Sequence, residues 1–267
     1  ARDTASLAAL ERWFASCPSC VVAFSGGVDS AVVAVLARRL LGRERVLAAI
    51  AVSPGLKRRD LAHARALAAT HDLALREVPT DELSDPHYQA NGGDRCYWCK
   101  AHYCGRFDAL RREVAYAWLL GGENRDDHAD HRPGLRAMAE AGVRAPLAEC
   151  GLGKAEVRAV AERLGLACWN RPASPCLASR IPYHTPITAA RLRQVEAAED
   201  ALAALGFTAS RVRHHGDLAR LEVPPADLPR LRRAEDAAVA AVTACGFARV
   251  EIDPEGLVSG KLNRALS

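Results

Sequence analysis

One six-residue motif near the N-terminus has the residue types that bind phosphate: Ser25, Gly26, Gly27, Val28, Asp29 and Ser30. Its two glycines allow the backbone to bend sharply and to point several N–H groups at one spot. Ser25 and Ser30 add hydroxyl donors, and a helix that Ser30 opens would present its N-terminus to an anion. Asp29 is unusual beside an anion, unless it helps to hold a Mg²⁺ that bridges phosphates. The motif therefore predicts a pyrophosphate site.

The spacing of this motif differs from that of other common phosphate loops. It lacks the lysine and the length of the G-x-x-x-x-G-K-[ST] loop, and it does not match G-x-G-x-x-G. An ordinary strand-to-helix turn with a serine cap is the alternative interpretation. The phosphate site is favoured because a short apolar run at residues 20–24 precedes the motif and a helical pattern follows it.

Apolar runs alternate with helical patterns along the first part of the chain. Strands are predicted at residues 20–24, 46–52, 73–78 and 118–120, helices at residues 4–16, 31–42, 57–71 and 154–164, and a Cys-rich turn followed by a helix at residues 91–112. This alternation predicts an α/β fold with a parallel, doubly wound, Rossmann-like sheet. Ligands of such sheets bind at the carboxyl ends of the strands. The polar turn after residue 120 should therefore join the phosphate motif at one edge, and it supplies three further candidates: Gly122, Asn124 and Asp127.

The composition changes after Trp169. The Pro-rich segment that follows cannot form a long helix or a central strand, so it is predicted to be a linker that carries chemistry. Beyond it the patterns predict a helix, two strands, a helix and a strand. We therefore divide the chain into a phosphate-binding domain at residues 1–168, a linker at 169–187 that carries Cys176, and a smaller α+β domain at 188–267.

Arginines in the linker and in the smaller domain are candidate anion contacts. Arg180 lies four residues after Cys176, where its charge could neutralise a phosphate. Arg211 and Arg213 alternate on a predicted strand, so both would point to one face and offer paired guanidinium groups to a phosphate. A solvated strand face is nearly as good an interpretation from the spacing alone.

The bulk composition excludes some classes of protein. The net charge of +4 is too small to argue for nucleic acid binding. No apolar run approaches the roughly 20 residues of a membrane-spanning helix, and residues 1–14 do not resemble a signal peptide, so the expected location is the cytoplasm. Nine cysteines exceed what packing needs in that compartment. Clustered cysteines should therefore bind metal or react.

The motif at residues 25–30, placed after an apolar strand, resembles the PP-loop of the ATP pyrophosphatases, the adenine-nucleotide alpha-hydrolase-like group. The resemblance implies that the loop binds the β and γ phosphates of ATP with Mg²⁺, for which Asp29 is a candidate ligand. It implies cleavage of ATP between the α and β phosphates and transfer of AMP to a substrate oxygen, which becomes a leaving group. The further ATP contacts assigned here are Gly122, Asn124, Asp127 and Arg180.

Other motifs narrow the resemblance to the LarE-type ATP-dependent sulfur transferases of nickel-pincer nucleotide cofactor synthesis. These motifs are D-R-C-Y-W-C-K at 94–100, G-G-E-N at 121–124, R-P-G-L at 132–135, P-C-L-A-S-R-I-P-Y at 175–183, R-V-R-H at 211–214 and the tail from G-F at 246–247 to S-G at 259–260. The resemblance spans nearly the whole chain. It implies that a carboxylate of pyridinium-3,5-biscarboxylic acid mononucleotide is adenylated and becomes a thiocarboxylate, with the substrate phosphate on Arg211 and Arg213. It also implies a homo-oligomer, with a hexamer as the candidate, and a smaller domain that serves substrate binding and assembly.

The source of the sulfur divides this family, and the cysteines bear on it. In one form a side chain, here Cys176, donates its sulfur and becomes dehydroalanine. In the other form three cysteines hold a 4Fe–4S cluster whose open iron carries a sulfide, and Cys96, Cys99 and Cys176 would match that triplet. Zinc is the next alternative, with His102 or Cys104 as a fourth ligand, and plain packing is the last.

Functions of other classes remain possible at this point. A tRNA-thiolating PP-loop enzyme shares the ATP chemistry but needs a basic RNA-binding surface. An amidotransferase-type synthetase needs an ammonia source, and the chain shows no glutaminase-like half. A module that only senses nucleotide would bind ATP at the loop without releasing pyrophosphate.

Overall fold

The computed structural model describes residues 2–129, 133–258 and 261 of the chain. It forms two compact units: Ala1–Glu82 with Cys96–Ser174, and Leu83–Arg95 with Pro175–Ser267. The later boundary falls inside the segment predicted as a linker. The sequence analysis did not anticipate that residues 83–95 belong to the second unit. Arg132, Ser259 and Gly260, which carry part of the family resemblance, lie outside the described residues.

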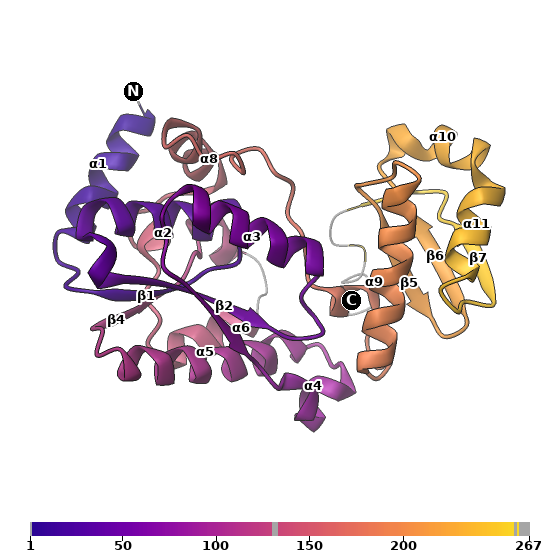
Figure 1. The fold of residues 1–267 in the computed structure, drawn as a ribbon, viewed down its shortest axis with the longest axis horizontal. Helices are drawn as coiled ribbons and strands as arrows, with labels where there is room; N and C mark the ends of the chain where they lie inside the picture. The colour runs from indigo at the N-terminus through magenta and orange to yellow at the C-terminus, as the bar shows by residue number, and fades with distance from the viewer. Residues whose placement is uncertain (1, 130–132, 259–260, 262–267) are drawn as a thin grey trace. The chain divides into compact units, whose positions relative to one another are not determined.

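The first unit is built on a four-stranded parallel sheet in the order β3-β2-β1-β4 (Figure 1). Its strands are β1 (Cys20–Ala23), β2 (Val46–Val52), β3 (Leu75–Pro79) and β4 (Trp118–Leu120). Every strand pair is parallel. The predicted parallel α/β fold is confirmed, and the predicted strands agree to within two residues at each end.

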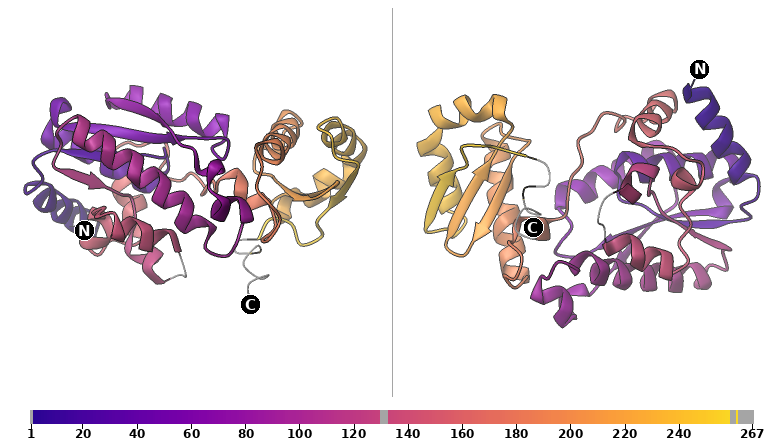
Figure 2. Two further views of the ribbon diagram at one scale, coloured as in Figure 1. Left: turned by 90° about the horizontal axis from the view of Figure 1, so that it is seen from below. Right: turned by 180° about the vertical axis from the view of Figure 1, so that it is seen from behind.

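Helices cover both faces of this sheet (Figures 1 and 2). The main helices of the unit are α1 (Arg2–Phe14), α2 (Val28–Leu41), α3 (Arg58–Thr70), α5 (Arg95–Glu113), α6 (Pro133–Glu140), α7 (Pro146–Glu149) and α8 (Lys154–Arg163). Val22 belongs to a core with residues of α1, α2 and α8, whereas its neighbour Val21 packs with Phe107 and Leu110 of α5. β1 is therefore buried on both faces, which explains its continuous apolar run.

The second unit contains α4 (Pro86–Ala90), α9 (Ala189–Ala204), β5 (Arg211–His215), β6 (Leu218–Glu222), α10 (Leu228–Arg233), α11 (Glu235–Thr243) and β7 (Arg249–Ile252). β5 pairs antiparallel with β6, and β6 pairs parallel with β7. Residues of α9, α10 and α11 share one apolar core with all three strands. The predicted order of elements is present, but the last predicted helix is two helices separated at Ala234.

No helix among the described residues has the length and apolar character that a bilayer crossing requires.

The bend after β1 depends on Gly26, whose φ angle is +73°. A Cβ atom at this position would lie 3.0 Å from both Cα and Cβ of Ala64 in α3. A side chain is therefore excluded by backbone conformation and by contact together. Gly42, at the end of α2, also has a positive φ of +89°, but a Cβ there would meet nothing within 4 Å.

These two glycines give a matched pair of substitutions. Gly42→Ala should lower the free energy of unfolding by the backbone cost alone, about 1–3 kcal/mol, because φ of 89° with ψ of 163° is a conformation that is essentially restricted to glycine. Gly26→Ala should cost a further 1–3 kcal/mol, roughly the penalty of overpacking a tight site. All four tryptophans lie in the first unit, so urea unfolding followed by tryptophan fluorescence reports on that unit. Equal midpoints of urea unfolding for the two variants would show that Ala64 can move aside without a cost in stability.

Candidate functional site

The two serines of the PP-loop motif are hydrogen-bonded to each other. Their hydroxyl oxygens lie 3.0 Å apart, and the backbone N–H of Ser25 donates to Ser30 Oγ at 3.1 Å. The Ser30 hydroxyl donates to the carbonyl of Gly27, whose N–H donates to Ser25 Oγ. These bonds hold the loop in a closed bend. Helix α2 begins at Val28 with Gly27 as its N-cap, so the expectation that Ser30 opens the helix is wrong: Gly27 is extended, and the helix takes in Val28 and Asp29.

The loop after β4 packs directly on the first turn of α2. A Cβ atom on Gly122 would lie 2.8 Å from the backbone N of Ser30 and 3.2 Å from the backbone C of Asp29. The two polar turns therefore meet at one edge of the sheet, as the parallel topology predicted. Only glycine allows this approach, because any side chain at position 122 would displace the start of the helix.

Asn124 connects the two loops. Its Nδ2 donates to Asp29 Oδ1 at 3.0 Å, and its backbone N–H donates to Asp127 Oδ2 at 3.1 Å. Asn124 and Asp127 are buried. Lys154 Nζ, at the start of α8, lies 3.8 Å from Asp127 Oδ1. The structure thus brings together Asp29, Asn124 and Asp127, three of the predicted site residues, and adds Lys154.

The surroundings of Asp29 destabilise the charged form of its carboxyl group. Burial raises the pKa of its carboxyl, and the nearby Asp127 raises it further, while the hydrogen bond from Asn124 and the charge of Lys154 act in the opposite direction. A divalent cation beside Asp29 and Asp127 would relieve this unfavourable burial. Among the described residues no three His, Cys, Asp or Glu side chains gather as a metal site. A Mg²⁺ held here would take its remaining ligands from phosphate and water.

A polar cluster at the start of α3 was missed by the sequence analysis. The buried Asp60 accepts hydrogen bonds from Arg171 Nη2 and from Ser174 Oγ, both at 2.7 Å. The buried Lys57 reaches Ser174 Oγ at 3.5 Å. These contacts fasten the last residues of the first unit, two positions before Cys176. No local pattern announces such a cluster, because its partners are more than 100 positions apart.

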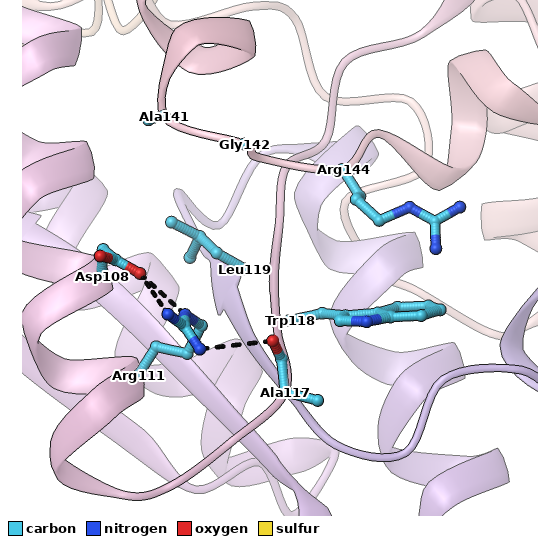
Figure 3. A pocket seen from close by; sticks show the side chains of 8 residues that line it. All are labelled: Asp108, Arg111, Ala117, Trp118, Leu119, Ala141, Gly142 and Arg144. Carbon is cyan, nitrogen blue, oxygen red and sulfur yellow. Dashed lines mark hydrogen bonds and ion pairs between the residues drawn. The ribbon is translucent and has the colours of Figure 1, made fainter.

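A pocket of about 190 Å³ lies elsewhere in the first unit, where β4 begins and α5 ends (Figure 3). Its arginines already have partners. Arg111 donates to Asp108 Oδ1 at 2.8 Å, and Arg144 stacks on Trp118 and binds Glu149. This pocket is at the amino end of β4, whereas Gly122 follows its carboxyl end. It is therefore not the nucleotide site.

In the second unit, Cys176 is exposed and immediately precedes a short 3₁₀ helix, η4 (Leu177–Arg180). Arg180 is buried, with 1% of its side chain exposed. Its Nε and Nη2 bind the two carboxylate oxygens of Glu199 at 2.6 and 3.2 Å. Its Nη1 donates to the carbonyls of Pro175 and Cys176 at 2.9 and 3.3 Å. This packing gives Arg180 a structural role at the Cys176 loop, and the ATP contact assigned to it stays a prediction.

Arg211 and Arg213 share one face of β5, as their alternation predicted, but their surroundings differ. Arg213 is buried, binds Glu222 Oε2 at 3.0 Å and donates to the carbonyl of Ser179 at 2.6 Å. Arg211 is half-buried, and in the part of the chain that the structure describes its guanidinium makes no hydrogen bond or ion pair. Burial lowers the pKa of Arg211, and the charges of Arg180 and Arg213 lower it further. Arg211 therefore differs from Arg213 in having no ion-pair partner among the described residues.

Cys96 and Cys99 lie one turn apart at the start of α5, not in a turn before it as predicted. Asp94, a residue type favoured just before a helix, precedes Arg95 and accounts for the early start. Cys96 is exposed and Cys99 is half-buried. The proposed fourth zinc ligands lie on the same helix: burial raises the pKa of Cys104 to about 11, and His102 Nδ1 lies 3.6 Å from Asp81 Oδ1.

Comparisons with known proteins agree with this geometry. Residues 13–94 match the NAD synthase family. The chain is 38% identical, over 246 residues, to the pyridinium-3,5-bisthiocarboxylic acid mononucleotide synthase of Lactiplantibacillus plantarum, which covers 92% of this chain and 89% of that protein. It is 40% identical over 262 residues to an uncharacterised protein of Synechocystis, with 97% of both chains covered. An uncharacterised protein of Methanocaldococcus jannaschii is 26% identical over 235 residues, 88% of this chain and 89% of its own length.

Two neighbouring carboxylates give opposite predictions for stability. Because the pKa of folded Asp29 is raised, its charge destabilises the fold at neutral pH and this cost disappears as the pH falls; Asp29→Asn should therefore raise the melting temperature at pH 7. The pKa of Asp126 is lowered, chiefly by the backbone N–H of Lys154, so Asp126→Asn should lower the melting temperature.

The same Asp29→Asn variant should lose Mg²⁺-dependent ATP binding, and wild-type binding should weaken as the pH falls toward the raised pKa of Asp29. Calorimetry with MgATP across pH checks this, and unchanged binding by Asp29→Asn would remove Asp29 from the metal site.

Proposed function

The chain belongs to the LarE-type family of PP-loop enzymes, and from that premise we propose that it is an ATP-dependent sulfur transferase acting on pyridinium-3,5-biscarboxylic acid mononucleotide. The observation that carries the proposal is the similarity to the Lactiplantibacillus plantarum synthase, which extends over 92% of the chain and so includes both units. Two features support it: the loop of residues 25–30, which its own hydrogen bonds hold in shape for binding phosphate, and the exposed thiol of Cys176 for sulfur transfer.

The first half-reaction would take place at the loop of residues 25–30. PP-loop enzymes use ATP with Mg²⁺, which when bound neutralises phosphate charge. The N–H groups at the start of α2 and the bend at Gly26 would hold the β and γ phosphates. A substrate carboxylate oxygen then attacks the α phosphorus, the bond to the bridging oxygen breaks, and pyrophosphate leaves. The product is an acyl adenylate, whose AMP is a good leaving group.

Arg211 would receive the phosphate of the substrate. It is a half-buried cation beside two arginines that have acidic partners, Arg180 with Glu199 and Arg213 with Glu222. Glu199 and Glu222 therefore balance the two buried arginines and leave the charge of Arg211 for a ligand. A guanidinium suits a phosphate because it can donate two parallel hydrogen bonds.

In the second half-reaction a sulfur atom attacks the activated carbonyl carbon, and AMP leaves. If Cys176 donates its own sulfur, the thioester must then lose its Cβ–S bond together with the Cα proton, which leaves dehydroalanine and a free thiocarboxylate. Two observations support a cluster as the sulfur source: Cys96 and Cys99 lie one helical turn apart, and Cys176 is exposed, although the described residues do not gather the three thiols at one point. When bound to three thiolates, a 4Fe–4S cluster would leave one iron open to carry a sulfide. We favour this cluster route, with Cys96, Cys99 and Cys176 as ligands, and expect a homo-oligomer.

Cys176→Ala should abolish thiocarboxylate formation and leave pyrophosphate release intact, because the thiol acts only after adenylation. Cys245→Ala, a half-buried cysteine of the same unit, is the matched control and should keep both activities. Product mass spectrometry and a pyrophosphate assay measure the two steps. Full thiocarboxylate yield from Cys176→Ala would refute the role. In the wild type, loss of one H₂S mass at Cys176 after turnover would identify donation by the side chain, whereas an intact Cys176 with bound iron supports the cluster.

Arg211→Gln should weaken substrate binding by about 10- to 100-fold, the equivalent of one charge-assisted hydrogen bond of roughly 1.5–3 kcal/mol. The loss should vanish when the dephosphorylated nucleoside replaces the nucleotide, because only the nucleotide carries the phosphate. Arg220→Gln is a suitable control, since Arg220 lies on the neighbouring strand and pairs with Glu251. Equal losses for nucleotide and nucleoside would show that Arg211 does not bind the phosphate.

A further inference from the structure

Residues 83–95 lie between two segments of the first unit in the sequence but belong to the second unit. The buried side chain of Asn91 accounts for this path. Asn91 is fully buried. Its side-chain Nδ2 donates to the backbone carbonyls of Pro182 and Thr185 at 2.7 and 2.9 Å. The backbone carbonyl of Asn91 accepts from the N–H of His184 at 3.0 Å. Asn91 therefore holds the far end of the irregular segment that begins at Cys176.

Arg95 extends the same contact to the turn that follows Cys176. It is buried, with 4% of its surface exposed, and it is the first residue of α5. Its Nη1 donates to Asn91 Oδ1 at 2.7 Å and to the carbonyl of Ala178 at 3.1 Å. Its guanidinium also stacks 5.5 Å from the centre of the Tyr183 ring. The next residue in the chain is Cys96.

These bonds are made to the backbone of the Cys176 segment, at several carbonyl oxygens and at the N–H of His184. Arg95 and Asn91 bind five positions of it: Ala178, Ile181, Pro182, His184 and Thr185. Arg180 fixes the same segment from α9 through Glu199. An irregular loop has no ladder of its own hydrogen bonds to hold it, so such contacts decide where its thiol lies.

We propose that Asn91 and Arg95 are positioning residues for sulfur transfer, because they hold the loop that carries Cys176 within the second unit. The inference rests on the proposed function and adds to it the groups that fix the sulfur-bearing loop. Misplacement of a reacting group by about 1 Å can cost 100-fold in rate. The loss of Arg95 should therefore act on the sulfur step and spare adenylation, which the phosphate loop performs.

The test uses the full chain purified without added iron. Iodoacetamide alkylates an exposed thiolate with loss of iodide, and peptide mass spectrometry gives the labelling rate of Cys176. Arg95→Met should label Cys176 faster than the wild type does, because the loop that carries the thiol is no longer held. Arg95→Met should also slow thiocarboxylate formation by about 100-fold with unchanged pyrophosphate release. Arg95→Lys, which keeps a donor and the charge, should recover part of both signals.

Controls separate positioning from folding. Arg112→Met removes an exposed arginine from the same helix and should behave as the wild type. If Arg95→Met does not fold, Asn91→Gly decides, because glycine accepts the φ of +55° at this position and only the amide is lost. Wild-type labelling of Cys176 and wild-type transfer in folded Arg95→Met, or in Asn91→Gly when that variant decides, would overturn the inference and leave the proposed function standing. A wild type that makes no thiocarboxylate would instead overturn the proposed function.

Discussion

The first unit depends on the close approach of three backbones at the carboxyl edge of its sheet. The bend at Gly26 touches Ala64 of α3, and the loop at Gly122 touches the first turn of α2 at Ser30. Neither approach tolerates a Cβ atom. The hydrogen bonds between Ser25 and Ser30 then hold the bend without any ligand. The N–H groups are therefore oriented before a phosphate arrives, and binding need not supply that ordering free energy.

The second unit is distinguished by buried charged side chains. Arg180 and Arg213 are almost completely buried, and each has a buried glutamate and backbone carbonyls as partners. Removing one member of such a pair usually costs about 3–5 kcal/mol, because the other charge is left uncompensated. The four charges thus act as fixed structure around the Cys176 loop. Arg211 lies on the same strand as Arg213, and its guanidinium makes no hydrogen bond or ion pair with the described residues, although Glu222 and Glu199 lie near enough to favour its charge.

The sequence allowed the fold of the first unit to be predicted almost completely, because strand burial and helix periodicity are local signals. The meeting of the two polar turns followed from the parallel topology. Roles that depend on distant partners could not be predicted. Arg180 looks like a solvent-accessible cation in the sequence, and only the proximity of Glu199, 19 positions later, makes it structural. Lys57, Asp60 and Asn91 gave no signal, since their partners lie about 90 or more positions away.

A sulfur donor must be exposed enough to meet its acceptor, yet held closely enough to react. Cys176 lies on an irregular, Pro-rich segment just before a short 3₁₀ helix, and its side chain is exposed there. The order then has to come from outside the segment, and Asn91, Arg95 and Arg180 supply it through bonds to its carbonyl oxygens. Bonds to the backbone leave the side chains of the loop available for chemistry. This arrangement accounts for the unusual chain path, since residues 83–95 reach these oxygens only by joining the second unit.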